Sequence, residues 1–237
     1  MLQKILKRTV FFNAVTLAKL LAQYIYENYR ESVEETARKL SSLSPIDLLV
    51  LTILSHKTTS INTIKAYNNL KQVIEINAET IVKTPSEVIE EAIKVSGLQK
   101  VKTNRIKKAC EYILKNFNGN LDFIRDIPTD EARKILLQIP GISYKTVDVI
   151  LLFSFNRHVM PVDVHIARIA FRTSLSDGRR DYEYIRQKIE KYFAKYDFKI
   201  IHLGLIEYGR KICRARKPKC SICVVRECCK YYCSLVK

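Results

Sequence analysis

The sequence predicts an all-α protein, and three observations lead to this fold class. Apolar residues recur at three- and four-residue spacing over most of the 237 residues, which is the period of an α-helix that buries one face. No run alternates between apolar and polar residues for long enough to predict a strand. Only 6 Gly and 6 Pro are present, as expected of helices that are joined by short turns.

The helical pattern consists of a first helix at Ala14–Tyr29 and nine later segments. Ser44 before Pro45 is a typical helix start, because a serine caps the helix and a proline suits its first turn. Gly97 is typical of a helix end. The nine predicted segments are 45–55, 62–76, 86–95, 103–117, 130–138, 144–155, 163–173, 182–196 and 198–211.

The charge of the chain points to a polyanionic partner. There are 41 Lys and Arg against 24 Asp and Glu, which gives a formal net charge of +17. Nucleic acid is the first candidate partner for so basic a chain, although a generally basic proteome would give the same charge. Hydrophobic residues make up 47%, which excludes an intrinsically disordered chain. No apolar stretch approaches the roughly 18 residues of a membrane span, so we expect no membrane partner.

The N-terminal segment is basic and amphipathic, and it has no acidic residue before Glu27. A mitochondrial transit peptide shares these properties but is rich in Arg and Ser. Because the first 21 residues contain one Arg and no Ser, we interpret them as helices of the mature protein. No secretory signal is visible, and we expect a monomer in the cytoplasm or nucleoid.

The seven cysteines are unevenly distributed. Cys110 stands alone in a helical pattern and is interpreted as a small core residue. The other six lie between 213 and 233, and such a cluster without a secretion signal indicates metal binding. Two sets of ligands are compatible with this cluster. An iron–sulfur cluster would be bound by Cys213, Cys220, Cys223 and Cys229, with Cys228 as the alternative to Cys229. A zinc ion would be bound by Cys220, Cys223, Cys229 and Cys233.

A helical hairpin is predicted over Asp130–Phe155, where two helical segments flank the tight turn Pro140-Gly141-Ile142-Ser143. The second helix begins with unpaired backbone N–H groups at the positive end of its dipole. Such an end binds a DNA phosphate without reading sequence. The alternative is an ordinary corner of a helical bundle.

Two residues near this hairpin have the chemistry of a catalytic pair. Lys145 opens the second helix, and an amine in that position can act as a nucleophile through a Schiff base. Asp163 lies 18 residues further on, in the run Met160–His165. On local sequence alone it is a helix N-cap, and a catalytic role requires it to face the lysine.

Together these motifs identify a family. The run Ile139–Thr146, then Val162–His165, then the Cys-x6-Cys-x2-Cys-x5-Cys spacing, resembles the endonuclease III branch of the helix–hairpin–helix (HhH-GPD) DNA glycosylases over nearly the whole chain from about residue 20. The resemblance implies a two-lobed all-α fold with a C-terminal iron–sulfur cluster loop. One lobe would be a six-helix domain at 38–157, the other would join 1–37 to 158–237, and damaged DNA would bind between them.

The resemblance also implies a role for each matching residue. Lys145 would attack C1′ of a flipped-out nucleotide, expel the damaged base and allow β-elimination through the Schiff base. Asp163 would activate the attack and stabilise the cationic sugar, and flipping is needed because C1′ is unreachable inside the stack. The four cysteines Cys213, Cys220, Cys223 and Cys229 would hold a [4Fe–4S] cluster, and the predicted DNA contacts are Lys57, Leu98, Pro140, Gly141, Ile142, Ser143, Arg216, Lys217 and Lys219.

The sequence departs from the family pattern at several of these positions. Ser143 stands where the family has its second hairpin glycine, which a serine can replace if its φ is negative. In the segment Leu54–Ser60, Lys57 and Ser60 replace the family's Gln and Asp, and His56 is adjacent. Lys57 would fill the gap left by the flipped base or would be a solvated lysine. Leu98 would be a wedge in the duplex or a buried residue after a helix-ending glycine.

Three functions follow in order of preference. The first is a bifunctional glycosylase and abasic-site lyase that acts on double-stranded DNA with damaged pyrimidines or abasic sites. The second is a glycosylase for thymine or uracil opposite guanine, favoured by the departures at His56–Ser60 and by Ser96–Lys100. The third is a non-catalytic DNA-binding protein that uses the hairpin.

Overall fold

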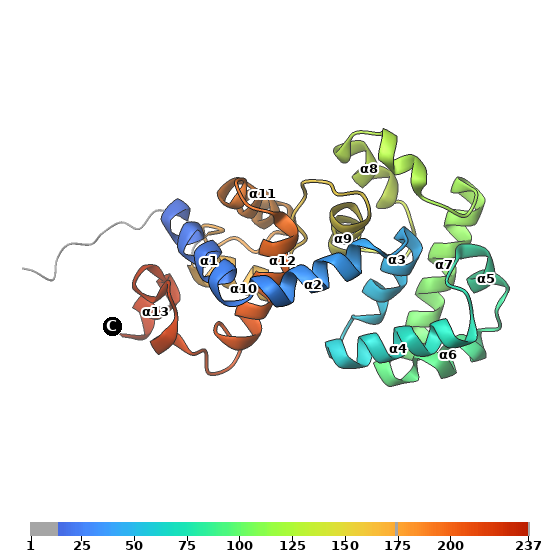
Figure 1. The fold of residues 1–237 in the computed structure, drawn as a ribbon, viewed down its shortest axis with the longest axis horizontal. Helices are drawn as coiled ribbons and strands as arrows, with labels where there is room; N and C mark the ends of the chain where they lie inside the picture. Colours follow the sequence, from blue (N-terminus) through green and yellow to red (C-terminus); the bar gives the residue numbers. More distant parts are fainter. Residues whose placement is uncertain (1–13, 174, 237) are drawn as a thin grey trace, which may run out of the picture. The chain divides into compact units, whose positions relative to one another are not determined.

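The chain forms two compact units, and each of them is built from helices (Figure 1). The structure, a computed structural model, describes residues 14–173 and 175–236, and no strand occurs among them. One unit comprises the chain up to Glu35 together with the chain from Val162 onward, and the other comprises Thr36–Pro161. The boundary near residue 35 falls inside the helix α2 (Arg30–Ser41).

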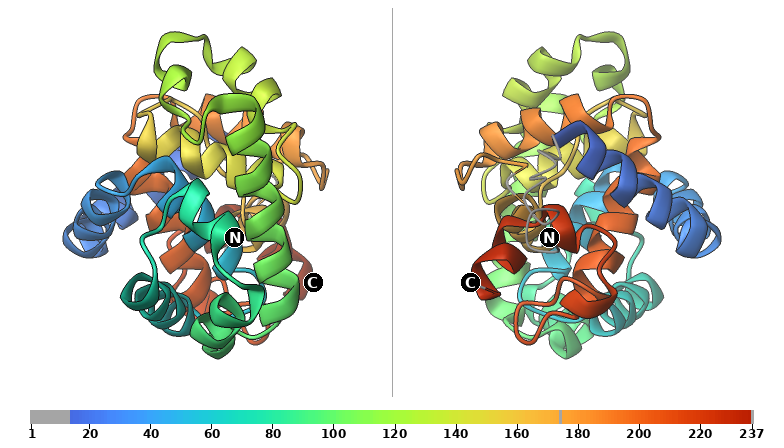
Figure 2. Two further views of the ribbon diagram at one scale, coloured as in Figure 1. Left: turned by 90° about the vertical axis from the view of Figure 1, so that its right-hand side faces the viewer. Right: turned by 90° about the vertical axis from the view of Figure 1, so that its left-hand side faces the viewer.

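The unit Thr36–Pro161 is centred on two apolar helices, α3 (Pro45–Leu54) and α9 (Tyr144–Ser154). They pack against each other, and α3 also contacts the long helix α7, which is prominent in the left panel of Figure 2. Burying nearly all of α9 provides a rigid support for the residues at its start. The other helices of this unit are α4 (Ser60–Val73), α5 (Ala78–Lys83), α6 (Ser86–Ile93), α7 (Gln99–Phe117) and α8 (Thr129–Leu136).

The other unit is organised around α12 (Phe198–Lys211), which packs on α1 (Ala14–Asn28) and on α10 (Val164–Thr173). Two glycines on α12 permit these close approaches. A Cβ at Gly204 would lie 2.2 Å from Cγ2 of Ile25 on α1, and a Cβ at Gly209 would lie 2.7 Å from Cβ of His165 on α10. The unit also contains α11 (Tyr182–Phe193) and the short α13 (Lys230–Leu235).

The predicted fold class is confirmed, and each of the nine predicted helical segments contains a helix. Three helices were not predicted: α2, α5 and α13. The first has few apolar residues, and the other two are six residues each, which is too short for a clear period. The predicted first helix is α1, and the segment 1–13 lies outside the described residues. None of the described helices is both long enough and apolar enough to cross a membrane.

Candidate catalytic hairpin and cysteine cavity

The predicted hairpin is formed by α8, a tight turn and α9. Gly141 has a φ of +81°, a conformation that residues with a side chain rarely adopt. Ser143 has a φ of −115° and caps α9, because its Oγ accepts a hydrogen bond from the backbone N–H of Thr146 at 3.4 Å. A serine at the position of the second family glycine is therefore unstrained. Lys145 is the second residue of α9 and is half-buried.

A buried ion pair, which the sequence did not predict, joins the two helices of the hairpin. Nε of Arg133 on α8 lies 2.7 Å from Oδ1 of Asp148 on α9, and Nη2 lies 3.2 Å from Oδ2. Asp148 is fully buried and Arg133 is 8% exposed. A two-bond contact of this kind fixes orientation as well as distance, so it sets the angle at which α9 presents Lys145.

His56 shares its surroundings with the candidate nucleophile. Its Nδ1 lies 3.5 Å from Nη1 of Arg105, and the side chain of Arg105 packs against the hairpin turn, where a Cβ at Gly141 would lie 3.4 Å from its Cγ. Burial lowers the pKa of His56, and the positive charges of Lys145, Arg105 and Lys102 lower it further. The imidazole is therefore kept neutral beside Lys145.

Backbone strain marks three of the predicted DNA contacts. Among the described residues, six that are not glycine have a positive φ, and three of these are Asn or Asp, which tolerate that conformation. The other three are Lys57, Leu98 and Lys217, with φ values of 52°, 54° and 48°. Their side chains are exposed, and Leu98 is 51% exposed, so the interpretation of Leu98 as a buried residue is wrong.

Asp163 caps α10 and belongs to the unit that contains α12. Its Oδ1 accepts hydrogen bonds from the backbone N–H groups of His165 at 2.9 Å and Ile166 at 2.8 Å. Its Oδ2 receives no hydrogen bond from the residues that the structure describes. The local role predicted for Asp163 is thus present, and one carboxylate oxygen remains for a second role.

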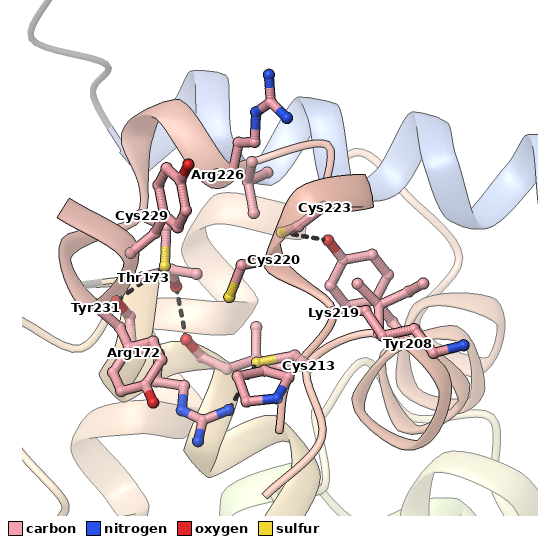
Figure 3. A pocket seen from close by; sticks show the side chains of 15 residues that line it. Arg172, Thr173, Tyr208, Cys213, Lys219, Cys220, Cys223, Arg226, Cys229 and Tyr231 are labelled. Atoms are coloured by element: carbon pink, nitrogen blue, oxygen red, sulfur yellow. Dashed lines mark hydrogen bonds between the residues drawn. The ribbon is translucent and has the colours of Figure 1, made fainter. Parts of the chain in front are cut away.

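Four of the six clustered cysteines line one cavity (Figure 3). The lining includes the Tyr208 ring from α12, Arg172 from α10, and the thiols of Cys213, Cys220, Cys223 and Cys229. Cys228 and Cys233 do not line it, and Cys233 is exposed. The cavity therefore gathers the predicted iron–sulfur ligand set and not the zinc set.

Two polar side chains lie against these sulfurs. The Tyr208 hydroxyl is 3.0 Å from Sγ of Cys223, and Nη1 of Arg172 is 3.5 Å from Sγ of Cys213. Burial raises the pKa of the Cys229 thiol to about 11. A metal or cluster that uses this sulfur must therefore displace a proton that the free protein holds firmly.

The cavity suits a group that is bound by thiolates. Within residues 14–173 and 175–236, no three Cys, His, Asp or Glu side chains converge on a point where they could hold a single metal ion. The thiols instead surround a space whose lining has no carboxylate or imidazole and includes the cations Arg172, Lys219 and Arg226. Four thiolates around an apolar space with cationic neighbours fit an anionic iron–sulfur cluster.

A basic loop leads from α12 into the cavity. The backbone N–H of Lys219 donates to the carbonyl oxygen of Ile212 at 3.0 Å and closes the loop. Arg172 donates to the carbonyl oxygens of Arg214 at 2.7 Å and Ala215 at 3.0 Å. Arg216, Lys217 and Lys219 are exposed on this loop, so the structure presents all three to solvent. The sequence did not predict the role of Arg172, whose only signal was an arginine on the polar face of a helix.

Comparison with known proteins gives consistent findings. A family model described as "HhH-GPD superfamily base excision DNA repair protein" matches residues 50–195. The Endonuclease III of Sulfolobus acidocaldarius is 34% identical over 190 residues, which cover 80% of this chain and 83% of that protein.

Solved structures share the fold. A trapped covalent intermediate of endonuclease III with DNA matches with a TM-score of 0.71 at 23% identity, over 89% of this chain and 98% of that one. A thermostable thymine-DNA glycosylase matches with a TM-score of 0.71 at 22% identity, over 91% and 98% of the two chains. At such identities, these matches establish the fold alone.

Proposed function

Since the chain belongs to the HhH-GPD superfamily of base excision DNA repair proteins and is an endonuclease III-like enzyme, we propose that it is a bifunctional DNA glycosylase and abasic-site lyase. Its substrate is double-stranded DNA with a damaged pyrimidine or an abasic site, and it acts as a monomer. The observation that carries the proposal is the hairpin, which holds Lys145 in the first turn of a buried helix directly after a phosphate-binding type of turn.

Lys145 is the nucleophile in this mechanism. Its amine attacks C1′ of a flipped-out nucleotide, the bond from C1′ to the base breaks, and the base leaves with a proton. The C1′–O4′ bond then opens, O4′ takes a proton, and the lysine nitrogen becomes doubly bonded to C1′ as a Schiff base. Loss of a C2′ proton from that intermediate breaks the bond to the 3′ phosphate. His56 lies beside this amine, and its pKa is lowered by burial and by the positive charges of Lys145 and Arg105, so the imidazole next to the nucleophile is neutral.

Asp163 is the carboxylate partner. The N-cap fixes its orientation through Oδ1, and the mechanism assigns Oδ2 to the positive charge that develops on the sugar. The mechanism requires that both side chains reach the same nucleotide.

Borohydride trapping tests the proposal. The wild-type chain should form a covalent adduct with a duplex that contains an abasic site, and Lys145→Ala should lose it, because borohydride reduces only the Schiff base. Lys134→Ala, an exposed lysine of the same hairpin, is the matched control and should trap normally. Asp163→Asn keeps a residue that can cap and should lower excision more than it lowers stability. An adduct that survives Lys145→Ala, or a wild-type chain that releases no base and cuts no strand, contradicts the proposal.

A mismatch glycosylase for thymine or uracil opposite guanine is the second candidate. It is favoured by the neutral His56 beside Lys145 and by Ser60 where the family has Asp. A panel of duplexes with one lesion each, scored separately for base release and strand cleavage, distinguishes the two. Excision of T or U opposite G with little activity on oxidised pyrimidines favours the second candidate.

The cysteine cavity is part of the same proposal. Cys213, Cys220, Cys223 and Cys229 are the ligands of a [4Fe–4S] cluster, which supplies a fold-stabilising cross-link when bound. Arg172 and the closed loop from Ile212 to Lys219 then hold Arg216, Lys217 and Lys219 toward a DNA phosphate. These three cations bind without reading sequence.

A further inference from the structure

The most unusual buried group outside the proposed catalytic pair is Lys102. It lies in the first turn of α7 and is only 2% exposed. No described carboxylate forms an ion pair with it. Burial alone lowers its pKa. A lysine is rarely buried in this way unless its hydrogen bonds repay the loss of hydration.

The ammonium of Lys102 bridges two helix ends. Its Nζ donates to the carbonyl oxygen of Leu54, the last residue of α3, at 2.8 Å. It also donates to the carbonyl oxygen of Ser96, the last residue of the 3₁₀ turn η2 (Lys94–Ser96), at 2.8 Å. Carbonyls at helix ends lack intrahelical partners and carry partial negative charge, so a cation between two of them satisfies both.

Each of these helix ends leads into a short segment that ends at a residue with a positive φ: residues 55–57, the Lys57 tip, and residues 97–98, the Leu98 tip. Lys57 follows Leu54 by three residues and Leu98 follows Ser96 by two, and both have positive φ values with exposed side chains. A glycine would adopt this backbone without cost. A lysine and a leucine there indicate that the side chain is what each position requires, since strain of this kind is retained where it serves a function.

We propose that Lys102 is a positioning residue that joins the Lys57 tip and the Leu98 tip into one rigid two-pronged wedge, which opens the DNA duplex at the lesion. The inference rests on the proposed function, and it states that the two tips enter the duplex together as one unit. Two separately mobile tips would lose conformational entropy when they enter the duplex. Because Lys102 already holds both tips in place in the free protein, that entropy is not lost on binding.

Lys107 on the same helix provides a matched control. Its Nζ donates to the carbonyl oxygen of Thr84 at 2.5 Å, and Thr84 is the C-cap of α5. Lys107 therefore has the same chemistry, a lysine on a helix-end carbonyl, but it is bonded to neither tip. Lys102→Met and Lys107→Met each remove the ammonium and keep an unbranched side chain.

Duplex opening is measured by the fluorescence of 2-aminopurine placed beside a tetrahydrofuran abasic analogue, at a temperature well below the thermal midpoints of all variants. Lys102→Met should lower the opening signal and the single-turnover excision rate about tenfold or more, as expected when a positioned group is released. Its affinity for undamaged duplex should stay within about twofold of wild type, because phosphate contacts dominate that affinity. Lys107→Met should open the duplex like wild type.

Several outcomes overturn the inference. The inference is wrong if Lys102→Met opens the duplex like wild type, or if Lys107→Met lowers the opening signal as much as Lys102→Met does. Either result leaves the proposed function intact. A wild-type chain that neither opens nor cuts any of these duplexes overturns both. If Lys102→Met does not fold, Lys57→Ala, Leu98→Ala and their double variant decide: coupled effects on opening support the wedge, and additive effects overturn it.

Discussion

At the scale of single residues, burial decides which of several chemically identical groups has a role. The six clustered cysteines differ little in sequence context, yet Cys229 is buried against the cavity while its neighbour Cys228 donates to the carbonyl oxygen of Val225, and Cys228 does not line the cavity. Lys102 and Lys100 stand on the same helix, and only the first is buried. The role of such a side chain therefore depends less on its residue type than on whether the backbone directs it into the protein interior.

The cysteine assignment predicts a difference between two adjacent substitutions. Cys229→Ser should lower the iron and sulfide content per chain and the visible absorbance of the purified protein, because it removes a ligand. Cys228→Ser should leave both unchanged. Iron content and absorbance after anaerobic purification are the measurements, and the assignment is wrong if Cys228→Ser loses the cluster and Cys229→Ser retains it.

The lowered pKa of His56 predicts how the free energy of unfolding depends on pH. Its pKa in the folded chain is lower than in the unfolded chain, first through burial and then through the charges of Lys145, Arg105 and Lys102. Just below the unfolded value of about 6.5, the unfolded chain therefore binds more protons, and the free energy of unfolding should fall as the pH decreases through this range.

Urea unfolding at about pH 7.5 and pH 5.5 measures this dependence. His56→Gln should have a smaller loss of stability between the two values than wild type. His158→Gln, which changes an exposed imidazole, is the control and should keep the wild-type loss. An equal loss in wild type and His56→Gln contradicts the interpretation.

At the scale of helices, the hairpin depends on a contact between its two arms. The Arg133–Asp148 pair is buried and doubly hydrogen-bonded, whereas ion pairs such as Arg30–Glu34 on α2 are exposed. A buried charge that loses its partner is far more costly than an exposed one, because water cannot replace the contact.

Arg133→Met should therefore lower the free energy of unfolding by about 3–5 kcal/mol, since it leaves the Asp148 carboxylate buried without this partner. The double variant Arg133→Met/Asp148→Leu should recover much of that loss. Glu34→Gln should leave stability nearly unchanged. Denaturant titration measures all three, and a loss for Arg133→Met no larger than for Glu34→Gln would show that the pair does not hold the hairpin.

At the scale of the whole molecule, the net charge of +17 governs the encounter with DNA. Neutralising phosphates releases counterions, so affinity falls with salt in proportion to the number of contacts. Three of the side chains that we propose to contact DNA phosphates lie on the basic loop: Arg216, Lys217 and Lys219. Arg172 holds the backbone of that loop through hydrogen bonds to two of its carbonyl oxygens.

Affinity for undamaged duplex should fall by roughly 10³ or more between about 50 and 200 mM salt, if six or more phosphates are contacted. Arg216→Gln should lower the slope of log affinity against log salt by about one. Lys191→Gln, an exposed lysine of α11 outside the loop, should change it less. Fluorescence anisotropy over a salt series is the measurement, and an affinity that is flat in salt would contradict the charge argument.

Local patterns in the sequence were sufficient to predict the fold class and the positions of nine helical segments. Those properties depend on local periodicity and caps, which a single chain displays directly. The sequence also indicated the hairpin turn and the spacing from Lys145 to Asp163, because both are continuous in sequence. The short helices α5 and α13 and the exposed α2 were missed, since their local signals are weak.

Three features became visible only in the packed chain. They are the cysteines that surround a common cavity, the pairing of Arg133 with Asp148 inside the hairpin, and the bonds by which Lys102 joins the segments of Lys57 and Leu98. In sequence, Lys102 is one of several lysines on a basic helix, and nothing local distinguishes it. Its role depends on two carbonyls that are 48 and 6 residues away. Burial and hydrogen bonding over such separations are properties of the packed chain, so the residues that align the predicted site became visible only in three dimensions.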